Sequence, residues 1–268
     1  MRTGGSPDGT TVGATVGVAT ALDELKSNGS ALLVVGSVPE EVYARVSACL
    51  LGDGCSADRR RLVVEDATIP DTRYASVDRW TPEWTRILEC DVVARGSTAA
   101  AGGSEAGPSS PRGPRSGRSA GAPFPGYESA GPSRDASPST RAGATREVSG
   151  SITNLGVEIG RGIRELDSVA GGLDPAELRV AFDCTDTLLA EYDEPTVFRF
   201  LHLLANNVRA VDGMAHVRLP KPYRAEVTRL FAPLFDAVVE LRLNGGRAEQ
   251  RWHLWESDAV SEWLPVES

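Results

Sequence analysis

The stretch ALLVVGSVPEE, residues 31–41, starts with five consecutive apolar residues and ends with a proline and two acids. A continuous apolar run of this length is typical of a strand buried on both faces of a sheet. Pro39 stands where proline is favoured in a first helical turn, and apolar residues recur at helical spacing over residues 42–51. The stretch therefore predicts a buried strand, a turn at Gly36-Ser37 and a helix.

Short apolar runs alternate with amphipathic segments along most of the chain. Strands are predicted at 62–64, 74–77, 90–93, 178–183, 214–219 and 237–241, and helices at 19–27, 152–166, 194–211 and 224–234. Asn244-Gly245 predicts a hairpin turn into a return strand at 249–255. This alternation predicts an α/β layered fold with a mostly parallel central sheet and a C-terminal antiparallel hairpin.

Residues 94–150 differ in composition from the rest of the chain. Of these 57 residues, 40 are Gly, Pro, Ser or Ala, which leaves too few large apolar groups to offset the entropy of ordering the chain. We predict a long disordered insert that serves as a solvated linker. The alternative is a mildly basic arm that folds back on the acidic body or touches an acidic partner. The halves 1–93 and 151–257 then form one domain, with residues 1–18 flexible and 258–268 a tail.

The charge balance excludes several classes of protein. The chain has 37 acidic and 28 basic residues, and 26 of the basic ones are arginine. An acidic, lysine-poor composition is favoured in a cytosol of very high salt, so we predict a halophilic, cytoplasmic protein. The net charge of −9 and the lack of a basic run argue against nucleic-acid binding. No apolar run is long enough to cross a membrane, and the spacing of cysteines and histidines indicates neither a metal site nor a disulfide framework.

Polar residues follow three of the predicted strands, at the edge where ligands bind in open α/β sheets. Gly36-Ser37 occupies the position of a phosphate-binding loop, and Glu65-Asp66 and Asp183 end two later strands. The carboxylates could position a water for hydrolysis or hold a metal, or they could merely cap the turns that follow. The phosphate-loop pattern G-x-x-x-x-G-K-[ST] is incomplete, because its second glycine, its lysine and its Ser/Thr are missing. We therefore expect no tight triphosphate binding in the usual manner.

The order of these pieces resembles RecA/KaiC-like ATPase domains, and in particular an uncharacterised haloarchaeal family of degenerate RecA/KaiC-like proteins. The resemblance extends over about residues 173–254 and, more weakly, over about residues 19–66. It implies a P-loop NTPase fold, with Glu65 or Asp66 at the catalytic carboxylate and Asp183 on the magnesium side. Gly36 and Ser37 would then belong to a degenerate nucleotide-binding loop.

These observations leave three hypotheses for the function. We favour a catalytically silent RecA/KaiC-like domain that acts as a regulatory or signalling module through contacts with a protein partner, without a cofactor. The second hypothesis is a nucleotide-binding protein or slow ATPase that holds Mg-ATP with an unusual loop, for which a cation such as Arg161, Arg164 or Arg224 must reach Gly36. The third is a structural subunit of a homo-oligomer.

Two further sets of residues receive structural interpretations. His202 lies among core positions of its helix, which predicts a partly buried structural histidine rather than a base. Trp252 and Trp255 fall on opposite faces of the closing strand, and we expect at least one of them to be ordinary packing.

Overall fold

The structure, a computed structural model, describes residues 25, 29–52, 58–66, 81–92, 143–255 and 258–266. The strands are β1 (Ser30–Val35), β2 (Arg60–Asp66), β3 (Thr85–Val92), β4 (Thr145–Gly150), β5 (Leu178–Phe182), β6 (Met214–Leu219), β7 (Ala237–Asn244), β8 (Arg247–Leu254), β9 (Ala259–Val260) and β10 (Leu264–Pro265). The helices are α2 (Glu40–Leu50), α4 (Ile152–Ala170), α5 (Thr185–Glu191), α6 (Glu194–Arg209) and α7 (Glu226–Phe231), with a 3₁₀ turn, η2, at Ala232–Leu234.

All these strands belong to one sheet with the order β10-β8-β7-β1-β6-β5-β2-β3-β4, in which β9 pairs with β8. Every pairing from β7 across to β4 is parallel, whereas the pairings of β8 with β7, β9 and β10 are antiparallel. The predictions of a mostly parallel central sheet and of a C-terminal antiparallel hairpin are therefore confirmed. The hairpin turn consists of Gly245 and Gly246, both with positive φ, one residue later than the sequence predicts.

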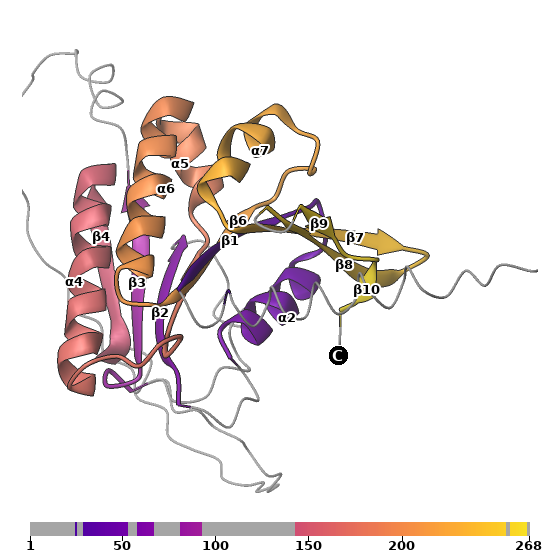
Figure 1. Ribbon diagram of the computed structural model, residues 1–268. Helices are drawn as coiled ribbons and strands as arrows, with labels where there is room; N and C mark the ends of the chain where they lie inside the picture. Colours follow the sequence, from indigo (N-terminus) through magenta and orange to yellow (C-terminus); the bar gives the residue numbers. More distant parts are fainter. Residues whose placement is uncertain are drawn as a thin grey trace, which may run out of the picture.

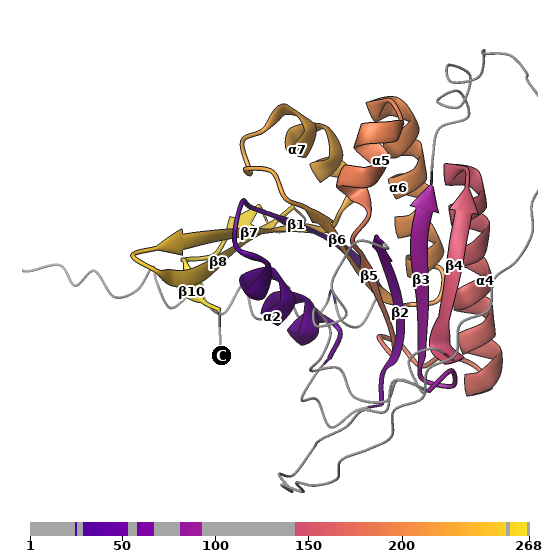
Figure 2. The same cartoon turned by 180° about the vertical axis from the view of Figure 1, so that it is seen from behind.

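Helices cover the two faces of the sheet unequally. Helices α4, α5, α6 and α7 lie on one face, and α2 lies on the other (Figures 1 and 2). The larger apolar core lies between the sheet and the four-helix face, and it includes Phe182, Leu155 and Leu201. A second core packs Tyr43 and Val46 of α2 against β1, β7 and β8. Because successive strand residues point to opposite faces, β1, β6 and β7 contribute to both cores.

Two capped helices fix the connections on the larger face. Ser151 begins α4 by accepting a hydrogen bond from the Asn154 amide, and Gly171 ends it in the left-handed conformation. Asp193 begins α6 by accepting a hydrogen bond of 3.0 Å from the Thr196 amide. Helix α4 begins directly after β4, whereas α6 begins after the short helix α5 that follows β5.

The structure corrects the expected limits of the insert and of the tail. Thr145–Gly150 forms β4, which pairs with β3, so the ordered second half begins before residue 151. Residues 259–260 and 264–265 of the expected tail pair with β8. The predicted strand at 90–93 is the end of the longer β3, and helix α5 is an addition. Residues 94–142 of the expected insert, the strand at 74–77 and nearly all of the helix at 19–27 lie outside the described residues.

One of the two predicted side-chain environments differs and the other is confirmed. His202 is exposed on α6 and lies 3.1 Å from the Asn206 amide nitrogen, because its position points away from the sheet. Trp252 is buried in the core on the α2 side and Trp255 is exposed, as expected for opposite faces. None of the helices in the described ranges has the length and apolar character that a bilayer span requires.

Candidate site at the carboxyl edge of the parallel sheet

The parallel sheet brings the predicted site residues to one edge. Strands β1, β6, β5 and β2 are consecutive neighbours, so their carboxyl ends lie side by side. Gly36 follows β1, Asp183 follows β5, and Glu65 lies near the end of β2. The sequence predictions for Gly36, Glu65 and Asp183 therefore concern a single region of the molecule.

A residue that sequence reasoning missed, Arg218 of β6, lies at the centre of this region. Its guanidinium donates to Asp183 Oδ1 at 3.3 Å and to Glu40 Oε2 at 2.9 Å. The guanidinium carbon also lies 4.4 Å from the centre of the Tyr43 ring. The Asp183 side chain is only 1% exposed, so the cation neutralises a carboxylate that is removed from water. Arg218 thus joins the ends of β5 and β6 to the first turn of α2.

The turn after β1 is tightly fixed by its backbone. The Gly36 amide donates to the Lys221 carbonyl at 2.9 Å, and Gly36 has φ of +132°. A Cβ atom at this position would lie 2.3 Å from the Leu241 carbonyl oxygen. Pro39 precedes α2 and has no amide hydrogen, while Glu40 and Glu41 occupy the first turn of the helix. The start of α2 therefore presents carboxylates, which repel an anionic ligand.

Gly36→Ala is expected to lower the free energy of unfolding by about 1–3 kcal/mol, through the left-handed φ and the contact with Leu241. Urea denaturation measures the loss. Gly171→Ala is the matched control, because Gly171 also has positive φ but nothing lies within 4 Å of a Cβ built there. Equal losses for the two variants would mean that the close approach to Leu241 contributes nothing.

The two acids at the end of β2 point to opposite faces of the sheet. Glu65 is 3% exposed and lies two residues after Val63, so both side chains point to the α2 side of the sheet. Asp66 accepts a hydrogen bond from the Thr187 hydroxyl of α5, on the other side. The two carboxylates therefore lie on opposite sides of β2, and Asp66 is held by α5.

Two buried thiols lie near Asp66. Cys90 of β3 is paired in register with Asp66, and its side chain forms a hydrogen bond with that of Cys184. Burial raises the pKa of the Cys184 thiol well above its usual value. This thiol therefore stays protonated and packs as a small apolar group.

A second polar pair on the α2 side of the sheet was also missed. His216 Nε2 of β6 lies 2.7 Å from the Ser47 hydroxyl oxygen of α2, and both residues are buried. Burial, together with the nearby positive charge of Arg179, lowers the pKa of His216 to about 3. The imidazole is neutral at ordinary pH and ties α2 to the sheet. Ser37, the serine that the sequence singled out, is exposed.

The family to which this sequence belongs is identified by a match over residues 29–241, from just before β1 to within β7. The chain belongs to the DUF7504 family. That family is described as one of unknown function. The matched region includes the whole carboxyl edge described above and ends before the return strand β8. None of the curated proteins compared with the chain matches it.

Within the DUF7504 region, the cations proposed from sequence lie elsewhere. Arg161 pairs with Glu158 on α4, and Arg164 lies on the same helix, which packs on β3 and β4. Arg224 lines a cavity with Trp255 beside α7. Lys221 follows β6, and its backbone carbonyl accepts a hydrogen bond from the Gly36 amide. Its side chain pairs with Asp186 at 3.2 Å.

The residues of the DUF7504 carboxyl edge do not fit a magnesium-bound nucleotide. Asp183, the acid expected beside magnesium, already faces a guanidinium, and Glu40 faces the same cation. A metal ion placed there would be repelled by Arg218. In the described residues, no three His, Cys, Asp or Glu side chains gather in a way that could hold a metal ion.

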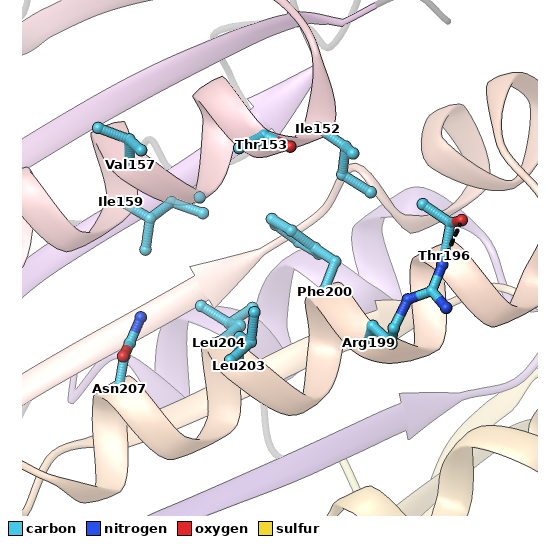
Figure 3. A pocket seen from close by; sticks show the side chains of 11 residues that line it. Ile152, Thr153, Val157, Ile159, Thr196, Arg199, Phe200, Leu203, Leu204 and Asn207 are labelled. Atoms are coloured by element: carbon cyan, nitrogen blue, oxygen red, sulfur yellow. Dashed lines mark hydrogen bonds between the residues drawn. The ribbon is translucent and has the colours of Figure 1, made fainter.

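A groove of about 460 Å³ lies between α4 and α6, on the face of the sheet that carries four helices. Figure 3 shows Ile152 and Ile159 of α4 facing Phe200 and Leu204 of α6 across it. A Cβ atom built at Gly156 of α4 would lie 3.7 Å from the Phe200 ring, so this glycine faces α6. The groove contains none of the residues that the sequence predicted for a site.

Proposed function

We propose that this chain is a catalytically silent RecA/KaiC-like domain that regulates or signals through protein contacts. One observation carries the proposal: Arg218 bridges Asp183 and Glu40 at the carboxyl edge of the sheet. The strand-end acid that the resemblance associates with magnesium is thus engaged within the protein. The loop after Gly36 also offers two acids rather than a lysine to a phosphate.

The parallel strands support the RecA/KaiC-like assignment. Strand β1 lies inside the sheet, between β7 and β6, and acids at the ends of β2 and β5 lie on the same carboxyl edge. This is the arrangement in which an open α/β sheet binds a ligand. A fold can persist after its original activity is lost, so the scaffold can serve as a contact surface instead.

Titration of magnesium-ATP into the protein in multimolar KCl, followed by calorimetry, tests the proposal. We expect no saturable heat for the wild type, because the Arg218 guanidinium already pairs with Asp183 and Glu40. A thermal melt with and without nucleotide should give the same midpoint, since a ligand that binds only the folded state raises it.

Asp183→Ala is the control for this titration. If the wild type binds magnesium-ATP with micromolar affinity and Asp183→Ala weakens that binding, the domain is a nucleotide-binding protein and the proposal is wrong. If neither protein binds, the nucleotide hypothesis is removed and the contact module stands. Circular dichroism of both proteins shows that they are folded in the titration buffer.

A further inference from the structure

The groove between α4 and α6 combines an apolar floor with two exposed apolar side chains on the same face. Ile152, Ile159 and Phe200 line its interior (Figure 3). Val157 and Leu203 also line it, yet they are 51% and 61% exposed. The lining residues on α6 run from Thr196 to Asn207, a length of about 16 Å along the helix. This face therefore has both an apolar groove and exposed apolar side chains that could enter an equivalent groove on another molecule.

This face differs in charge from the rest of the chain. The sequence has 37 acids in 268 residues, yet residues 196–207 and 152–157 contain none. Glu158, the next acid on α4, already pairs with Arg146 and Arg161. Depletion of charge at an apolar surface patch is the compositional mark of the centre of a protein interface.

From these observations we infer that the groove is the interface with a second copy of this chain. The inference rests on the proposed function and names the partner for its protein contacts. A chain with a net charge of −9 repels its own copies, and this repulsion is weakest where two copies approach through a face without acids. A two-fold interface also needs a patch that complements itself, which the exposed Leu203 beside the groove provides.

The spacing on α6 fits a two-fold axis that crosses the helix near Leu203. Such an axis sets the α6 helices of the two copies antiparallel. Arg199 lies four residues before Leu203 and Asn207 four residues after it, so both are one turn away on the same face. Arg199 then faces the partner subunit's Asn207, where a guanidinium donor meets an amide oxygen.

Sedimentation of the full chain in multimolar KCl, over a range of protein concentrations, tests the interface. The wild type should reach about twice the monomer mass of 28.4 kDa. Leu203→Glu should raise the dimer dissociation constant at least about a hundredfold, because it places two carboxylates beside the axis. A wild type that remains monomeric at its solubility limit overturns the inference.

Leu243→Glu is the matched control, because Leu243 is also an exposed leucine but lies at the end of β7, away from the groove. It should leave the dimer intact. A dimer that survives Leu203→Glu would place the interface elsewhere and overturn the inference. If the protein binds magnesium-ATP and still dimerises through Leu203, the proposed function is wrong and the proposed interface stands.

Discussion

Arg218→Met is expected to lower the free energy of unfolding by about 3–5 kcal/mol, the range found when one partner of a buried ion pair is removed. The loss arises because Asp183, with a side chain 1% exposed, would remain in the interior without the guanidinium that faces it. Methionine keeps much of the volume and of the contact with Tyr43, so the charge is the main change. Urea denaturation at neutral pH measures the difference.

Arg161→Met is the control for a surface arginine, since the Arg161 side chain is half exposed and pairs with Glu158 one turn away. Its expected cost is below about 1 kcal/mol. Adding Asp183→Asn to Arg218→Met should restore part of the lost stability, because the buried group is then uncharged. If Arg218→Met costs no more than Arg161→Met, the bridge does not hold the carboxyl edge together.

Short, mainly apolar runs predicted the core of the fold. The strands at 31–35, 178–182 and 214–219 are buried almost throughout, and such runs can be recognised because a strand covered on both faces needs apolar groups on both sides. The same reasoning placed Gly36 and Asp183 at strand ends. Because parallel strands end at the same edge of a sheet, these two residues could then be assigned to one region.

The strand β4 could not be predicted from such a pattern. Val148 is its one buried residue, because β4 is the last strand of the sheet and most of its other side chains remain partly or fully exposed. Composition therefore grouped it with the Gly- and Ser-rich stretch before it. Edge strands carry a weak apolar signal, and composition alone misassigns them.

The groups that complete the site were missed for a different reason. Arg218 and His216 are the two polar residues of β6, and their spacing of two shows that they share a face. Their partners Glu40 and Ser47 lie about 170 residues earlier, on α2. Only the strand order, which sets β6 beside β1, brings α2 to that face. The contacts of Arg218 with Glu40 and of His216 with Ser47 therefore cannot be predicted from the sequence unless the strand order is known.

The buried His216 should make the protein lose stability as pH falls from about 6.5 toward 3. Its pKa is about 3 when folded and near 6.5 in the unfolded chain, so the unfolded state binds the proton first. The full stability is present above pH 6.5 and decreases by about 1.4 kcal/mol for each pH unit below it. Urea denaturation between pH 7 and 5 measures this slope, in a range where carboxylates with ordinary pKa values remain ionised.

His216→Gln should flatten this slope, since glutamine does not titrate and its amide can still hydrogen-bond to the Ser47 hydroxyl. His202→Gln is the matched control, because His202 is exposed on α6, and it should keep the wild-type slope. Equal slopes in the wild type and in His216→Gln would show that the imidazole takes up its proton without unfolding. That outcome would require α2 to move away from β6, because the imidazole of His216 is 2% exposed and lies against α2.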